Sequence, residues 1–232
     1  MNMRRGIKGY NLKILPISDI HGKPHIFDYI LDEIDPDSYD LLICAGDVWE
    51  GTGIGGKYKW DLFQQQINKE IIMIQGNHDF WTSTAFDGMP NIHLLHNESI
   101  IVDDVKFFGT PNTVNFMNWN HMSDEKTLFE LWDKRMPDDI DVMISHGPPY
   151  GYGDNCNQPV YGNTKDSHLG SKALKQIILD KNPQYVFCGH IHTGDRVTEM
   201  DNGTKIHNVS CLDEAYMFMG HNPPPEVVEL RL

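Results

Sequence analysis

Short runs of apolar residues, most of them β-branched, alternate along this chain with segments that have helical spacing. The clearest runs occupy residues 12–18, 40–45, 71–74, 140–145 and 185–188. Because the runs are short and show little polar alternation, they are typical of strands buried on both faces of a parallel sheet. Ile26, Ile30 and Ile34 recur every four residues, which predicts a helix over 25–34.

The remaining periodic segments complete an alternation of strands and helices. Further helices are predicted over 60–68, 124–135 and 167–181, and Ser123 is the expected N-cap residue of the second one. Strands with hairpin-like spacing are predicted within 91–103 and 105–108, and strands of a second sheet over 205–210 and 227–230. Such alternation predicts an α/β fold with parallel strands, and we expect one domain over 1–232.

Polar residues of a restricted kind follow the five clearest strands. They are Asp19 with His21, Asp47, Asn77 with His78, His146, and His190 with His192. The carboxyl ends of parallel strands meet at one edge of a sheet, which is where ligands bind in open α/β sheets. Any one of these motifs is equally well explained by a solvated turn. Five in succession, each closing an apolar run, are a strong signal for a site.

The chemistry of these side chains favours metal ions. Seven of them offer carboxylate, imidazole or amide groups and none offers a thiolate: Asp19, His21, Asp47, Asn77, His146, His190 and His192. This set suits Mn²⁺, Fe or Zn²⁺ and is richer in nitrogen than a Mg²⁺ site. Seven ligands are too many for one ion with an open position, but they fit two divalent ions that share a bridging carboxylate.

Composition and charge narrow the classes of partner. The net charge of −14 over 232 residues repels phosphate backbones, so no broad nucleic-acid surface is expected. No apolar run approaches the length of a membrane span, and the basic segment 1–13 lacks an apolar signal core. The four cysteines lack CxxC spacing and are expected to be buried thiols. These features predict a soluble, cytoplasmic protein that does not bind membranes.

The order of the motifs DxH, GD, GNHD, H and GHxH, from Asp19 to His192, resembles the calcineurin-like metallophosphoesterase superfamily. The segment His146-Gly-Pro-Pro, the later Asn-Pro-Pro and the small size are most similar to the branch of small, single-domain metallophosphoesterase-domain proteins. The resemblance implies a four-layer α-β-β-α sandwich, in which two mixed sheets lie face to face with helices outside.

The resemblance also implies roles for individual residues. The first metal would be held by Asp19, His21, Asp47 and His192, and the second by Asp47, Asn77, His146 and His190. Asp47 would bridge the two ions, and His78 would be the catalytic acid. Asp79 stands where the family has an acidic residue, and it would act beside His78 by orienting the loop or the imidazole.

The implied reaction is the hydrolysis of a small phosphodiester, for example a nucleotide or a cyclic nucleotide. Two ions, two aspartates and a bridging hydroxide sum to a charge of about +1, which attracts a phosphoester. In this mechanism the hydroxide attacks phosphorus and His78 protonates the leaving group. The alternatives are a phosphomonoesterase or nuclease acting at the same site, or a non-catalytic metal-binding scaffold.

Two features of the sequence bear on the substrate. Val48-Trp49-Glu50-Gly51 replaces the Asp-Arg-Gly that follows the second motif in the protein phosphatases of the superfamily, and we expect no cap region of the DNA-repair nuclease type. Phe116 and Trp119 lie in an aromatic loop that would either stack a base or pack on the core. The other histidines, including His168, are expected at the surface or in loops.

Overall fold

The computed structural model describes residues 11–48, 63, 65–80, 86, 89–117, 119–156 and 167–232. The segment 50–56, which contains four glycines, and Trp49 lie outside these ranges. Part of the helix expected over 60–68 also lies outside them, but Phe63 and 65–67 are helical. None of the helices in the described ranges combines the length and apolar character that a membrane crossing requires.

Parallel strands form the centre of the first sheet. They are β1 (Asn11–Ile17), β2 (Leu41–Cys44), β3 (Glu70–Met73) and β4 (Ile92–Leu94), and they lie side by side in this order. The last strand of the chain, β13 (Val228–Arg231), pairs antiparallel with β1 at the edge. The run 227–230 therefore belongs to the first sheet, and its expected place in the second sheet is wrong.

The second sheet is also parallel at its centre and antiparallel at both edges. Its strand order is β11 (Val197–Glu199), β12 (Lys205–Asn208), β10 (Tyr185–Cys188), β9 (Val142–Ser145), β6 (Val105–Thr110) and β5 (Glu98–Val102). The β5–β6 hairpin forms one antiparallel edge as its spacing predicts, and β11 forms the other. The other strand within 91–103, β4, instead pairs parallel with β3 in the first sheet. A small separate pair joins β7 (Thr113–Val114) to β8 (Met122–Ser123).

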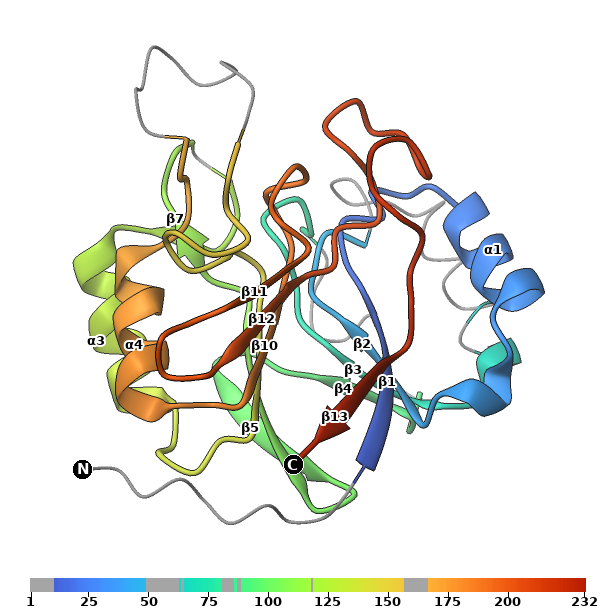
Figure 1. Cartoon of the computed structure of the whole chain (residues 1–232), viewed down its shortest axis with the longest axis horizontal. Helices are drawn as coiled ribbons and strands as arrows, with labels where there is room; N and C mark the ends of the chain where they lie inside the picture. The colour runs from blue at the N-terminus through green and yellow to red at the C-terminus, as the bar shows by residue number, and fades with distance from the viewer. Residues whose placement is uncertain are drawn as a thin grey trace.

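Helices cover the outer faces of the two sheets. Helix α1 (His25–Glu33) packs on the first sheet, while α3 (Glu125–Arg135) and α4 (Lys172–Lys181) pack on the second, as Figure 1 shows. A single turn of 3-10 helix, η1 (Pro36–Ser38), leads from α1 towards β2. The predicted fold class, a four-layer sandwich with two mixed sheets, is confirmed.

Successive residues of the central strands point alternately into two hydrophobic cores, one between a sheet and its helices and one between the two sheets. Leu15 faces α1, whereas its neighbour Ile14 faces the second sheet, and both are fully buried. Phe107 and Phe187 enter the same inter-sheet core from the other side. Because both faces of each sheet are covered, these strands are apolar throughout, which is why the sequence shows runs rather than alternation.

Two helix starts differ from the prediction. Asp124 caps α3, since its Oδ1 accepts a hydrogen bond from the Thr127 backbone N–H at 3.0 Å, and the expected cap Ser123 belongs to β8. Helix α4 begins at Lys172, with the Ser171 hydroxyl accepting from the Leu174 N–H. The part of the predicted helix at 167–170 is not helical, and His168, Leu169 and Gly170 line a pocket described below.

We predict that Phe107→Ala lowers the free energy of unfolding by roughly 3–5 kcal/mol, because it removes a large ring from the closed space between the sheets. Urea unfolding followed by circular dichroism measures this change. Ile101→Ala is the matched control, because Ile101 lies on the neighbouring strand with 64% of its surface exposed. Equal effects of the two substitutions would contradict the assignment of the inter-sheet core.

Candidate metal centre

Strand ends from both sheets meet at one edge of the sandwich. Strands β1, β2 and β3 lead into Asp19, Asp47 and Asn77, whereas β9 and β10 lead into His146 and His190. The two edges are joined by a bridge between Ser18 and Ser210. The candidate ligands therefore come from two facing sheets rather than from one continuous edge.

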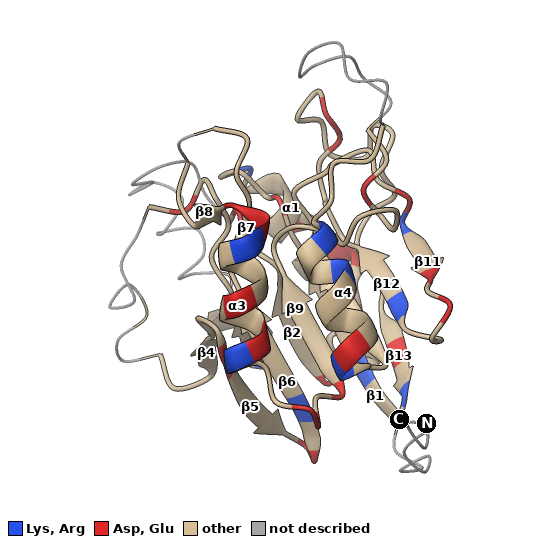
Figure 2. Ribbon diagram, turned by 90° about the vertical axis from the view of Figure 1, so that its left-hand side faces the viewer, with Lys and Arg blue, Asp and Glu red and all other residues tan. Residues whose placement is uncertain are grey.

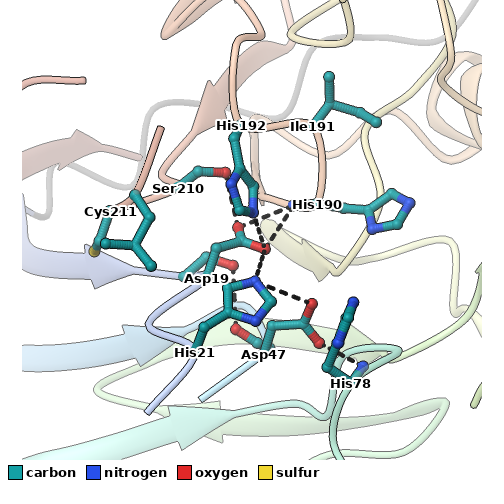
Figure 3. A network of polar contacts seen from close by, with 12 residues as sticks. Asp19, His21, Asp47, His78, His190, Ile191, His192, Ser210 and Cys211 are labelled. Carbon is teal, nitrogen blue, oxygen red and sulfur yellow. Dashed lines mark hydrogen bonds and ion pairs between the residues drawn. The ribbon is translucent and has the colours of Figure 1, made fainter. Parts of the chain in front are cut away.

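Asp19 is the polar link between the two sheets (Figure 3). Its Oδ2 accepts hydrogen bonds from the His190 backbone N–H at 2.9 Å and from the Ser210 hydroxyl at 2.7 Å. Burial of this carboxylate raises its pKa, but the neighbouring histidines, His192 first among them, outweigh burial and hold the pKa well below its usual value. Asp19 is therefore an anion in the interior of the protein.

The first group of potential ligands consists of Asp19, His21 and His192, whose donor atoms all lie within 4.8 Å of one another. Asp19 Oδ1 is 3.4 Å from His192 Nε2 and 3.9 Å from His21 Nε2. His192 Nδ1–H donates to the Asp213 carbonyl at 3.0 Å, because a carbonyl can only accept. That bond points the other ring nitrogen, Nε2, at Asp19, as is usual for metal-binding imidazoles.

The second group consists of Asp19, Asp47 and His146. His146 Nδ1–H donates to the Ala45 carbonyl at 2.9 Å, which again leaves Nε2 facing the site. This nitrogen is 2.8 Å from Asn77 Oδ1 and 3.3 Å from Asp47 Oδ2. If the His146 ring were neutral, the lone pairs of its Nε2, of Asn77 Oδ1 and of Asp47 Oδ2 would face one another. A proton or a metal ion is therefore required between these three atoms.

The spacing of these atoms fits metal ions. Ligands about 2.0–2.1 Å from one ion lie roughly 3.0–3.4 Å from each other, and the His146–Asp47 and His192–Asp19 distances are 3.3 and 3.4 Å. Burial lowers the pKa of His146, but Asp47 raises it, with a net result of about 9. The surroundings of His146 thus favour positive charge at this position.

Asp19 belongs to both groups, and Asp47, a member of the second group, also lies beside His21 of the first. Asp47 Oδ2 is 3.7 Å from His21 Nε2 and 3.3 Å from His146 Nε2. Its Oδ1 accepts the His78 backbone N–H at 2.8 Å, which fixes the orientation of the carboxylate. This position is the one that a bridging ligand requires.

His190 reaches the site differently from the other candidate ligands. Its backbone N–H binds Asp19, while its ring extends away from Asp19 and Asp47 in Figure 3. The ring centre is 5.0 Å from that of His146, and the residue lines the same pocket. Burial, and then the charge on His146, lower the pKa of His190 to about 3, so the ring is neutral and able to bind a metal.

The backbone at the site is strained. Four non-glycine candidate ligands adopt left-handed conformations: Asp19 with φ 53°, His21 with φ 47°, Asp47 with φ 53° and His190 with φ 69°. Each such residue costs of order 1–3 kcal/mol and persists only where its surroundings enforce it. Strain concentrated in four candidate ligands indicates a functional site.

Two glycines of the motifs allow the close approach of these segments. A Cβ on Gly76 would collide with Asp47 Oδ1, and a Cβ on Gly189 would collide with Asp19 Oδ2 and Ser18 Oγ. The glycines in GNHD and GHxH are therefore required because carboxylates lie directly against the backbone.

His78 and Asp79 follow Asn77 but point in different directions. The His78 ring stacks on Trp119, with ring centres 4.3 Å apart, and meets the edge of His21 at 4.9 Å. Asp79 is fully buried, and its Oδ2 accepts the backbone N–H groups of Gly76 and Asp47, each at 2.8 Å. Asp79 is not among the residues that line the pocket, and its hydrogen bonds hold the loop that carries His78.

A pocket of about 440 Å³ opens over the candidate ligands. Phe116 lines it, with its ring centre 5.3 Å from that of His190. Trp119 is not among its lining residues, because its ring covers His78 instead. Of the two expected stacking residues, the structure therefore brings only Phe116 to the pocket.

Residues that sequence reasoning did not select form the rest of the pocket wall. They are Tyr150, Cys156, His168, Lys172, Glu214 and Tyr216, together with smaller neighbours. Tyr216 has a φ of 57°, and its ring lies 4.8 Å from that of His21. These residues lie in loops or at a helix start, where no periodicity marks them. Left-handed backbone at a tyrosine is visible only in the structure.

Comparison with known proteins agrees with this geometry. Residues 12–194 match the family model of the calcineurin-like phosphoesterases, and the chain belongs to this family. It is therefore a metallophosphoesterase, a hydrolase of phosphoester bonds.

Individual relatives place the chain among small members of the family. A UPF0046 protein of Caenorhabditis elegans is 26% identical over 224 residues, which cover 86% of this chain and 70% of that protein. Human metallophosphoesterase domain-containing protein 1 is 27% identical over 254 residues, covering 96% of this chain and 72% of that protein. The predicted resemblance to such proteins is confirmed.

A solved structure shows the same fold at lower identity. The protein TT1561 of Thermus thermophilus superposes with a TM-score of 0.60 at 12% identity, and the match covers 86% of this chain and 89% of that one.

We predict that Asp47→Asn removes both metal ions, because this carboxylate contacts both groups of ligands. Elemental analysis of Mn²⁺-loaded protein should show a fall from about two ions per chain to well below one. Asp32→Asn, at an exposed position on α1, is the matched control for the loss of one charge. Full metal content in the Asp47 variant would refute the bridging role.

Proposed function

We propose that this protein is a phosphodiesterase that hydrolyses a small phosphodiester, such as a nucleotide or cyclic nucleotide. The observation that carries the proposal is the placement of the His78 imidazole beside two groups of potential metal ligands in one pocket. His78 would then donate a proton to the leaving-group oxygen of a phosphoryl group whose other oxygens are held at the metal centre.

The cofactors we propose are two divalent ions, Mn, Fe or Zn. The first would be held by Asp19, His21 and His192, and the second by His146, Asn77 and His190, with Asp47 shared. When bound, such ions lower the pKa of water and neutralise charge on the phosphoryl oxygens. The protein contributes a rigid set of donors, because His192 and His146 are each oriented by a backbone carbonyl.

His78 is the proposed proton donor. Its backbone N–H is bound by Asp47 and its ring is stacked on Trp119, so both ends of the residue are held in place. An alkoxide is a poor leaving group and departs faster when it receives a proton in the transition state. Trp119 then acts by orienting His78 rather than by stacking a base.

The pocket favours a diester of modest size. A volume of about 440 Å³ is far larger than a phosphate group, and it leaves room for organic groups on both sides of phosphorus. The net charge of −14 opposes long nucleic-acid substrates. In Figure 2, positive and negative positions alternate along α3, so this helix presents no continuous basic surface to a polyanion.

We also propose a reducing compartment, the cytoplasm, as the location of the protein. Cys44, Cys188 and Cys211 are buried free thiols, whereas Cys156, which was also expected to be buried, is half-buried in the pocket wall. Burial raises the pKa of each of the three buried thiols. Thiols in this state are typical of proteins that are not exposed to oxidants.

Activity towards a chromogenic series tests the proposed reaction. With Mn²⁺ present, we expect kcat/KM for bis(p-nitrophenyl) phosphate to exceed that for p-nitrophenyl phosphate by about tenfold or more. A higher value for the monoester would favour the alternative phosphomonoesterase, and no turnover of either would favour the non-catalytic scaffold.

We predict that His78→Ala keeps its metal content and lowers kcat for an alkyl phosphodiester by about 10²–10⁴-fold. The loss should be smaller with p-nitrophenolate, which leaves without a proton. His25→Ala is the control, because His25 is exposed and does not line the pocket. Unchanged turnover of the alkyl diester would exclude His78 as the donor.

A further inference from the structure

The wall of the pocket formed by the segments around 150 and 170 carries its own polar cluster. His168 Nδ1 lies 2.7 Å from Asp154 Oδ1, and Asp154 is almost completely buried. The other oxygen of Asp154 accepts the backbone N–H groups of Gly151 at 3.0 Å and Gly170 at 2.9 Å. The buried carboxylate thus fixes the orientation of the His168 ring, whose Nδ1–H must donate to it.

Tyr150 joins this pair to a cationic side chain. Its ring centre is 5.6 Å from that of His168, and Lys172 Nζ lies 4.9 Å from the Tyr150 ring centre. Tyr150, His168 and Lys172 all line the pocket, whereas Asp154 stands behind them. Among the described residues that line the pocket, Lys172 is the one lysine or arginine. A cation and a carboxylate-bound imidazole therefore share one wall.

This wall is rigid and fixed relative to the metal centre. The Tyr150 N–H donates to the Ser171 carbonyl at 2.9 Å, and the Ser171 N–H donates to the Pro148 carbonyl at 3.0 Å. Because Pro148 comes two residues after the candidate ligand His146, the wall is anchored directly to the site. Side chains held in this way recognise a ligand at a low cost in entropy.

The backbone N–H groups at the start of α4 are not available to bind an anion. The Glu125 carboxylate accepts the backbone N–H groups of Lys172 and Ala173, each at 2.8 Å. These helix-end donors are already satisfied, so recognition on this wall depends on side chains.

We infer that Lys172 and His168 bind a second anionic group of the substrate, so that the natural substrate is a phosphodiester with a further phosphate or carboxylate. The inference rests on the proposed phosphodiesterase function and adds specificity to it. Lys172 and His168 are specificity-determining residues, and Asp154 is a positioning residue that acts through His168. Glu214 lines the same pocket, and its carboxylate accepts hydrogen bonds from the Thr193 hydroxyl and the Cys156 thiol. Its negative charge repels anions from the part of the pocket that it lines.

Two chromogenic diesters that differ in one group test this inference. They are thymidine 5′-(p-nitrophenyl phosphate) and its 3′-phosphorylated form, which release the same p-nitrophenolate. With Mn²⁺-loaded protein, we expect KM to be about tenfold lower for the 3′-phosphorylated ester, with a similar kcat. Lys172→Met and His168→Gln should each remove most of this preference, so that the KM values of the two esters become nearly equal.

Lys175→Met is the matched control. Lys175 lies one turn further along α4, within 6 Å of the same Tyr150 ring, and does not line the pocket. It should keep the full preference, whereas Asp154→Asn should lose only part of it, because His168 is still present but its ring is no longer held by a carboxylate.

The possible results separate the two proposals. Turnover of neither ester would refute the phosphodiesterase function itself. Equal KM values for both esters, or a preference that survives in the Lys172 and His168 variants, would overturn the anion site while leaving that function in place. Circular dichroism of each variant confirms that the fold is intact.

Discussion

A buried anion that belongs to both sheets is the constraint on which the site depends. Asp19 follows β1 of the first sheet, yet its carboxylate accepts hydrogen bonds from His190 and Ser210 at the edge of the second. An isolated carboxylate in this position would be very unfavourable, so the surrounding imidazoles and any bound cation are needed to balance it. The contact between the two sheets thus lies at the Asp19 carboxylate, whose negative charge requires positive charge beside it.

The same constraint accounts for the local backbone. Candidate ligands approach one another only because their segments turn sharply, which places Asp19, His21, Asp47 and His190 in left-handed conformations. Asp79 offsets part of that strain by binding the backbone N–H groups of Asp47 and Gly76. A rigid set of donors is what a phosphoesterase needs, since preorganised charge stabilises the transition state without rearrangement.

The sequence predicted those features that only a few residue types can form. Apolar runs that end in Asp, Asn or His marked the strands and the candidate ligands, because buried strands and metal donors both restrict composition. The prediction failed for β13, since a short amphipathic strand carries no information about which sheet it joins. Tyr150, His168 and Tyr216 were missed because loops have no periodicity. The role of Trp119 stayed open between stacking a base and packing on the core, because its contact with His78 depends on tertiary structure.

The central claim is that remote strand ends build one site for two cations around Asp47. Anomalous diffraction from crystals grown with Mn²⁺ tests it most directly. We expect two peaks about 3.5–4 Å apart, one beside Asp19, His21 and His192 and the other beside His146 and Asn77, with Asp47 touching both. A single peak, or Mn²⁺ bound away from Asp47, would contradict the account.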